Sequence, residues 1–145
     1  MSVYADTSFL VSLYVLDANS EKAVSHIQQA KLPILLTTFG ELELTNAISL
    51  RLFRRELASA RAKATHALVR KDIVDGVLLI KQMTMNNFEK AMQMARRRTP
   101  HLGTRTLDIL HVASALELKA ETFYTFDHNQ ARLAKAEGLR VTPEK

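Results

Sequence analysis

The chain contains no cysteine, only four glycines and three prolines, and no apolar run near the ~20 residues of a membrane span. The absence of cysteine excludes disulfide bonds and thiol catalysis, and it is compatible with a reducing compartment. The shortage of glycine and proline leaves little material for the turns of an all-β fold. We therefore expect a soluble, cytoplasmic, helix-rich protein that does not enter a membrane.

Length and charge limit the organisation further. With 145 residues, the chain is long enough for one compact domain and too short for two of ordinary size, so we expect a single domain over residues 1–145. Twenty Lys and Arg against fifteen Asp and Glu give a formal net charge of +5. A basic surface suits a polyanion such as RNA, although a charge of this size is also common in proteins without such a partner.

Short apolar runs alternate with segments of helical periodicity along the chain. The predicted strands are residues 3–5, 34–37, 77–80, 122–126 and 139–141. The predicted helices are residues 9–16, 20–30, 39–55, 59–71, 87–98, 105–119 and 129–138, the fifth capped by Asn87 and stopped at Thr99-Pro100. Strands separated by helices predict an α/β fold with a central, mostly parallel sheet covered on both faces, a three-layer α/β/α sandwich.

Two aspartates directly follow predicted strands. Asp6 follows the strand at residues 3–5, and Asp127 follows the strand at residues 122–126. Ligands of open α/β sheets bind outside the carboxyl ends of the strands. The two carboxylates therefore converge if their strands are neighbours in the sheet.

Two further acids lie on apolar faces of predicted helices. The residues one turn from Glu43 are Phe39, Asn46, Ala47 and Leu50, a mostly apolar face, and Asp108 begins a helix with largely apolar surroundings. A lone buried carboxylate is strongly unfavourable unless it is paired or bound to a metal. We therefore expect one metal site, built from these residues: Asp6, Glu43, Asp108 and Asp127.

The remaining acids are predicted to be ordinary surface charges, because residues such as Glu56, Asp72 and Glu137 lie among polar or charged neighbours. Glu41 is the one competing assignment for Glu43. It lies two residues away on the same predicted helix and is therefore rotated off the Ala47 face.

Four short segments together resemble the PIN-domain nucleases, specifically the VapC-type toxins. The resemblance covers nearly the whole chain and rests on Asp6-Thr7-Ser8-Phe9-Leu10, Glu43-Leu44-Thr45-Asn46-Ala47, residues 105–115 around Asp108, and Thr125-Phe126-Asp127 followed by Arg132-Leu133-Ala134 and Gly138-Leu139. Each segment is weak alone, but their order and spacing are specific.

The resemblance implies a Mg²⁺- or Mn²⁺-dependent endoribonuclease that leaves 5′-phosphate and 3′-hydroxyl ends, is commonly a homodimer and is blocked by an antitoxin protein. It assigns catalysis and metal binding to Asp6, Glu43, Asp108 and Asp127. It also implies that Thr125 helps to place Asp127, and that Thr7 or Ser8 supports Asp6. Mg²⁺ prefers oxygen ligands, and a cation would relieve the mutual repulsion of the carboxylates.

Basic residues near the acids are candidates for RNA contacts. Arg97, Arg98 and Arg105 precede Asp108, and a second cluster at Arg51, Arg54 and Arg55 follows Glu43. Each cluster could hold phosphates or simply be a solvated helix end. His111, one turn after Asp108, could touch substrate, but a histidine on an apolar helix is more often a hydrogen-bonded packing residue.

Other functions remain to be separated from this one. A dehalogenase-like phosphatase would need an aspartate two residues after Asp6, where the chain has Ser8. Two alternatives stay open: an RNA-processing PIN nuclease that is not a toxin, and a non-catalytic module that binds RNA or protein.

Overall fold

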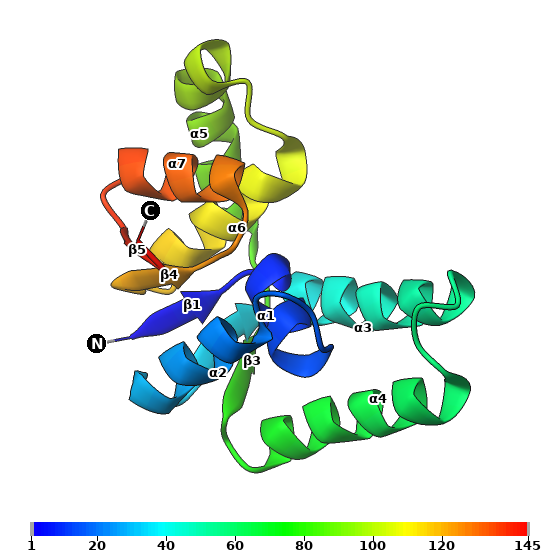
Figure 1. Ribbon diagram of the computed structural model, residues 1–145. Coiled ribbons are helices and arrows are strands. Elements are labelled where there is room, and N and C mark those ends of the chain that lie inside the picture. The colour runs from blue at the N-terminus through cyan, green and yellow to red at the C-terminus, as the bar shows by residue number, and fades with distance from the viewer. Residues whose placement is uncertain (1, 145) are drawn as a thin grey trace.

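A five-stranded parallel sheet forms the centre of the computed structural model, which describes residues 2–144 (Figure 1). The strands are β1 (Val3–Ala5), β2 (Ile34–Thr37), β3 (Leu78–Lys81), β4 (Thr122–Tyr124) and β5 (Arg140–Thr142), in the spatial order β3-β2-β1-β4-β5. Every pair of neighbouring strands is parallel. The predicted α/β fold and its parallel sheet are therefore confirmed.

The helices form two layers, one on each face of the sheet (Figure 1). One layer contains α1 (Thr7–Tyr14), α2 (Ser20–Gln29), α3 (Thr38–Phe53) and α4 (Ser59–Val74), and the other contains α5 (Met85–Leu102), α6 (Thr106–Glu117) and α7 (His128–Ala136). Across residues 2–144, no helix combines the length and the apolar character needed to cross a membrane.

Alternate residues of the strands supply two separate hydrophobic cores. In β1, Val3 and Ala5 pack into the core beneath α1 to α4, whereas Tyr4 packs into the core beneath α5 to α7. In β4, Tyr124 and Phe123 divide in the same way. This alternation follows from the two-residue period of a strand. Because both faces are covered, the central strands β1 and β2 read as nearly continuous apolar runs.

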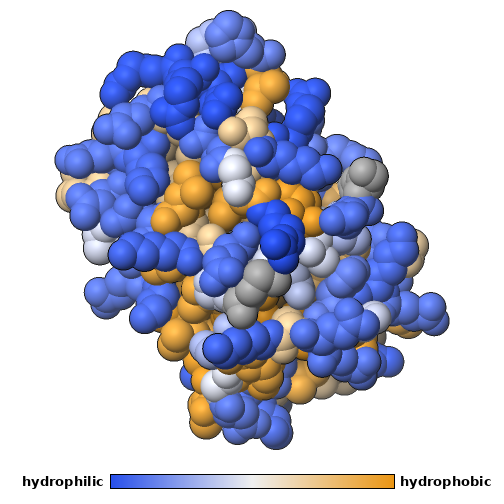
Figure 2. Space-filling model, turned by 90° about the vertical axis from the view of Figure 1, so that its left-hand side faces the viewer, coloured by the Kyte–Doolittle hydropathy of each residue, from blue (hydrophilic) through white to orange (hydrophobic). Residues whose placement is uncertain are grey.

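The loops after β1 and β4 meet at one edge of the sheet, because these two strands are neighbours although they lie far apart in sequence. β2, the strand that follows β1 in sequence, lies on one side of β1, and β4 lies on the other. The carboxyl ends of β1 and β4 therefore form a topological switch point. The backbone N–H of Asp6 extends the pairing by donating to the Tyr124 carbonyl at 3.0 Å. Figure 2 shows the molecule from the side that carries the amino end of β1, where polar side chains cover most of the surface.

The predicted start of α5 at Asn87 is wrong. The N-cap is Thr84, and Asn87 is the third helical residue, whose side-chain oxygen accepts from the Thr84 backbone N–H at 3.2 Å. The Thr84 side chain in turn accepts from the Asn87 backbone N–H, and this reciprocal pair of bonds is a capping box. The Asn87 side chain is buried and also donates to the Ser114 hydroxyl of α6 at 3.0 Å. Asn87 therefore joins the two helices as well as supporting the cap.

The predicted stop at Thr99-Pro100 is also wrong, because α5 continues to Leu102. Pro100 lies in the last turn, where the lack of an N–H removes one hydrogen bond without preventing the turn. The helix ends at Gly103, whose N–H donates to the Thr99 carbonyl at 2.9 Å and whose φ is 60°. Glycine adopts this left-handed conformation without steric cost, so Gly103 sets the boundary.

Two boundaries beside the acids also differ from the expectation. α1 begins at Thr7, two residues earlier than predicted, because Asp6 is its N-cap. β4 ends at Tyr124 rather than residue 126. Thr125 still donates its N–H to the Thr142 carbonyl of β5 at 3.0 Å, and Asp127 then caps α7. Asp6 and Asp127 are therefore both N-cap residues.

Candidate active site

Asp6 is fully buried, and its carboxylate accepts several hydrogen bonds. Oδ1 accepts from the Ser8 hydroxyl at 2.7 Å and from the Phe9 backbone N–H at 2.9 Å. Oδ2 accepts from the Thr125 hydroxyl at 2.5 Å. The carboxylate therefore begins α1 and is fixed to the loop after β4 at the same time.

Thr125 connects the first and last acids of the set. Besides donating to Asp6, its oxygen accepts from the Asp127 backbone N–H at 2.9 Å. The Asp127 carboxylate caps α7, with Oδ1 accepting from the N–H groups of Asn129 at 2.8 Å and Gln130 at 2.9 Å. One hydroxyl thus positions both aspartates.

Glu43 projects from α3 towards α1 and α6. Its Oε1 accepts from the Thr7 hydroxyl at 2.5 Å and interacts with Nε2 of His111, also at 2.5 Å. The other ring nitrogen of His111 lies 2.8 Å from the Tyr4 hydroxyl. A chain of side chains therefore runs from the sheet through His111 to Glu43. Of the two residues predicted to support Asp6, Ser8 contacts it, whereas Thr7 contacts Glu43 instead.

Burial raises the pKa of Tyr4 well above its ordinary value, so its hydroxyl stays protonated. This hydroxyl contacts Nδ1 of His111 and so holds the ring with Nε2 towards Oε1 of Glu43. Burial acts to raise the pKa of Glu43, but the hydrogen bond and charge interaction with His111 and the Thr7 hydrogen bond outweigh it and lower the pKa. Glu43 is therefore held as a carboxylate.

Asp108 lies in the first turn of α6 and is almost completely buried. Its Oδ2 accepts from Nε of Arg105 at 3.1 Å, and a terminal nitrogen of the same guanidinium lies 3.6 Å from Oδ2 of Asp127. The hydrogen bond and charge of Asp108, together with the charge of Asp127, raise the pKa of Arg105. One cation thus bridges two of the four acids.

Three of the acids share one cleft, which has a volume of about 350 Å³. It is lined by Glu43, Arg105, Thr106, Leu107, Asp108, Asp127 and Gln130. Asp6 lies behind this lining and is joined to it through Thr125 and the backbone of Asp127. The fold therefore gathers all four predicted acids at one place, from the β1–α1 junction, α3, α6 and the β4–α7 loop.

The donor set suits a hard divalent cation in its chemistry, because it consists of carboxylate and hydroxyl oxygens. Arg105 already occupies the position between two of the carboxylates as a positive charge. Among residues 2–144, no three or more His, Cys, Asp or Glu side chains are arranged to hold a metal ion as they stand. A cation held by both Asp108 and Asp127 would compete with Arg105 for Oδ2 of each carboxylate.

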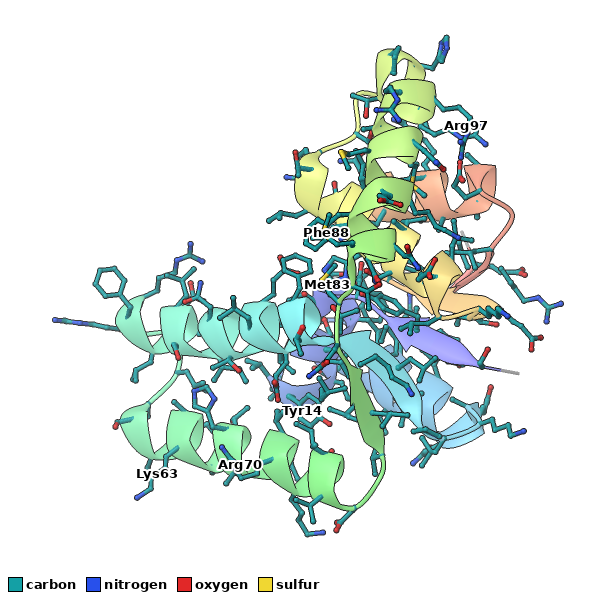
Figure 3. The ribbon with its side chains drawn as sticks, turned by 180° about the vertical axis from the view of Figure 1, so that it is seen from behind. Tyr14, Lys63, Arg70, Met83, Phe88 and Arg97 are labelled. Atoms are coloured by element: carbon teal, nitrogen blue, oxygen red, sulfur yellow. The ribbon has the colours of Figure 1, made fainter. Side chains whose placement is uncertain are left out.

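The other two predicted RNA contacts lie elsewhere. Arg97 and Arg98 each donate to the Glu137 carboxylate at 2.6 Å, and Arg98 also donates to the Ala136 carbonyl at 2.8 Å. Figure 3 shows Arg97 on α5, beside α7. Glu137 is not the ordinary surface charge that was predicted, since its side chain is only 7% exposed and pairs with both arginines. These residues tie α5 to α7 rather than lining the acidic cleft.

Tyr4 was missed as a contributor to the site, because a tyrosine in an apolar strand reads as core. His111 is a buried, hydrogen-bonded residue, but it bonds to a site carboxylate. Its position one turn after Asp108 was the feature of the sequence that could have indicated a place in the site. Glu41, the competing assignment, lines a different hollow, between α3 and α4.

Comparison with known proteins places the chain in a family. It matches the PIN domain over residues 3–136 and belongs to the PIN domain family, whose nucleases are hydrolases that act on nucleic acids. This confirms the resemblance to PIN-domain proteins that the sequence predicted. No curated protein matches the chain in sequence.

Several solved structures share the fold. VapC20 of Mycobacterium tuberculosis, described as a toxin that cleaves the sarcin-ricin loop, has 21% identity and a TM-score of 0.67 over 95% of this chain and 96% of its own. FitAcB of Neisseria gonorrhoeae has 17% identity and a TM-score of 0.73, covering 96% and 95% of the two chains. A toxin–antitoxin complex from Klebsiella pneumoniae has 13% identity and a TM-score of 0.60, covering 88% and 87%.

The burial of Asp6 leads to a prediction about stability. Burial raises the pKa of this carboxyl above its ordinary value, against the opposing effects of His111, Thr125, Phe9 and Ser8. The wild-type fold therefore loses stability as the pH rises through that raised pKa. Asp6→Asn removes the buried charge and keeps a good N-cap. In metal-free buffer near neutral pH, it should increase the free energy of unfolding by about 1 kcal/mol.

Urea denaturation of both proteins between about pH 4 and pH 8 measures this effect. The advantage of Asp6→Asn should shrink towards zero at the acidic end, where Asp6 is protonated. Asp75→Asn, which removes an exposed partner of Lys71, is the control and should show little change at any pH. A less stable Asp6→Asn protein near neutral pH would mean that the hydrogen bonds to the carboxylate outweigh its burial.

Proposed function

We propose that this protein is a divalent-metal-dependent endoribonuclease that acts as the toxin of a toxin–antitoxin pair. The observation that carries the proposal is the convergence of Asp6, Glu43, Asp108 and Asp127 from four separate segments. Buried carboxylates are unfavourable in a fold unless they serve a purpose such as metal binding. RNA is a polyanion and suits a chain with a formal net charge of +5.

The same four acids are the proposed ligands of Mg²⁺ or Mn²⁺ and the catalytic residues. A bound divalent cation supplies a water of lowered pKa and positive charge that stabilises the transition state of phosphodiester hydrolysis. Thr125 and Ser8 hold the Asp6 carboxylate in place. Thr7 and His111 fix Oε1 of Glu43 and so orient the carboxylate.

Arg105 has two roles in this proposal. In the described structure it neutralises Asp108 and Asp127. Its side chain is 69% exposed at the mouth of the cleft. Once it has released the two carboxylates, its guanidinium can hold a phosphate of the RNA, for which its planar donors are well suited. Arg97 and Arg98, paired with Glu137, are left with a structural role.

The similar structures support the toxin assignment. One of them is described as a toxin that cleaves the sarcin-ricin loop and another as a toxin–antitoxin complex, although identities of 21% and 13% show only the fold. By this analogy the partners are an antitoxin protein and a second copy of the chain, in the cytoplasm. Exposed apolar side chains on α5 and α6 suit a protein contact, namely Met85, Phe88, Met92 and Leu107.

Cleavage of RNA by the purified protein tests the enzymatic part. With Mn²⁺ or Mg²⁺ it should produce discrete fragments bearing 5′-phosphate and 3′-hydroxyl ends. EDTA should abolish the reaction. Asp6→Asn and Asp108→Asn should each lower the rate by at least about 100-fold, because each removes a carboxylate from the proposed metal site. Glu41→Gln is the matched control on α3 and should cleave normally, since Glu41 lines a different hollow.

Activity that survives EDTA or both aspartate substitutions would mean that the four acids are not the catalyst. No cleavage by protein freed of any antitoxin would instead favour the non-catalytic module.

His111 leads to a separate prediction about metal affinity. Removal of a side chain that orients a metal ligand typically weakens metal binding by about 10–100-fold. His111→Ala should therefore weaken Mn²⁺ binding by such a factor, measured by calorimetry without RNA. His111→Gln should weaken it less, because its amide can still donate to Glu43. A His111→Ala protein that is folded and binds Mn²⁺ normally would show that His111 only packs.

Expression in bacteria tests the toxin part. The wild-type protein should arrest growth, whereas Asp108→Asn should not. Co-expression of the neighbouring gene product should restore the growth of cells that express the wild-type protein. An active nuclease whose expression is harmless would favour the RNA-processing alternative.

A further inference from the structure

A second hollow adjoins the acidic cleft and has no role in the function proposed so far. Its volume is about 430 Å³, within the usual range of small-molecule pockets of ~300–1,000 Å³. It lies between α1, the loop before α2, α3 and the β4–α7 loop, and is lined by Thr7, Ser8, Val11, Ser12, Asp17, Asn19, Ala47, Leu50, Arg51, Arg54, Phe126 and Asp127. Asp127 lines both hollows, so the second begins where the first ends.

The lining of this hollow is divided by chemistry. Val11, Ala47, Leu50 and Phe126 give it an apolar part. The Phe126 ring stacks on Phe9, with ring centroids 5.2 Å apart and an interplanar angle of 13°, and is therefore held in one orientation. A fixed aromatic ring in a hollow is a suitable platform for a nucleobase.

Asp17 is a fixed hydrogen-bond acceptor in the same hollow. Its Oδ2 accepts from the Ser12 hydroxyl at 2.8 Å, and its Oδ1 accepts from the Asn19 backbone N–H at 2.8 Å. Oδ1 also accepts from the Ser20 hydroxyl at 3.4 Å, whereas Oδ2 has a further lone pair. A carboxylate held in this way can accept from an N–H group on the edge of a base.

Two arginines lie on the α3 side of the hollow. Arg51 is in the last turn of α3, and its nearest acid is Glu56 at 3.9 Å, a long and weak ion pair. Arg54, the C-cap residue of α3, is exposed. A pair of guanidinium groups beside an apolar base platform suits the phosphate of the same nucleotide.

We propose that this hollow binds one unstacked nucleotide of single-stranded RNA next to the cleaved bond, with its base against Phe126, a base N–H on Asp17 and its phosphate on Arg51 and Arg54. The proposal rests on the proposed nuclease function and adds to it the site that selects the RNA. Because a base must leave the stack to enter, the site accepts loops and single strands and rejects continuous duplex.

The test uses two substrates that separate the hollow from the acids. The first is a fluorescently labelled single-stranded RNA. The second is bis(p-nitrophenyl) phosphate, a phosphodiester that has no N–H donor for Asp17 and no second phosphate for Arg51 and Arg54. Arg54→Ala should raise KM for the RNA by about 10-fold, the loss of one charge-assisted contact. Its rate on the small ester should equal that of the wild type. Arg54→Lys should recover part of the RNA affinity.

Lys63→Ala is the matched control, because it also removes one exposed positive charge. Figure 3 shows Lys63 on α4, pointing away from α3. It should leave KM unchanged for both substrates. In an Asp108→Asn background, the slope of log K against log salt for RNA binding should fall by about 0.7 for each arginine removed, and not for Lys63→Ala.

Asp17→Asn tests the contact with the base. The carboxylate only accepts, whereas the amide also donates, so the substitution should change which nucleotides flank the cuts while the rate on the small ester is retained.

Failure of the inference can be distinguished from failure of the proposed function. If the wild type cleaves neither substrate, the nuclease proposal itself fails. If it cleaves RNA but Arg54→Ala and Asp17→Asn match Lys63→Ala in KM and in cut positions, the hollow is not a nucleotide site. Equal losses on RNA and on the small ester would also overturn it, because they would show that the substitutions damage the acidic cleft instead.

Discussion

The hydrogen bond from Thr125 to Asp6 is the contact on which the arrangement of the site depends. It joins segments that are 119 residues apart and fixes the carboxylate that caps α1. The same oxygen accepts from the N–H of Asp127, which caps α7. The two helix starts and the two aspartates are therefore positioned together. Thr125 can reach Asp6 only because β1 and β4 are parallel neighbours whose carboxyl ends lie side by side.

The site concentrates negative charge in a partly buried place, and the surrounding residues share the task of holding it. Hydroxyl groups stabilise Asp6, His111 and Thr7 stabilise Glu43, and Arg105 neutralises Asp108 and Asp127. Asp6 remains unfavourably placed as an anion, since burial raises its pKa. Such strain is typical of functional sites, where activity is favoured over the stability of the fold.

Several assignments could be made from sequence because the signal was local. An acid directly after a strand, or alone on an apolar helix face, stands out against the burial preferences of charged residues. The error about Glu137 has a long-range cause: its partners Arg97 and Arg98 lie on α5, about forty residues earlier, and a residue's neighbours in sequence do not reveal such a pairing. The errors at Asn87 and Pro100 arose because several residues can end or begin a helix, and the backbone geometry at Thr84 and Gly103 decided between them.

The sequence by itself determined the α/β class, the alternation of strands and helices, and the four acids that stand out, because periodicity and burial preference are properties of short segments. Tertiary structure alone decided that Tyr4 and His111 orient Glu43, that Thr125 serves two aspartates, and that Arg105 rather than Arg97 or Arg98 reaches the cleft. These contacts depend on strand order and helix packing. They join residues whose separation in the chain leaves no local pattern to read.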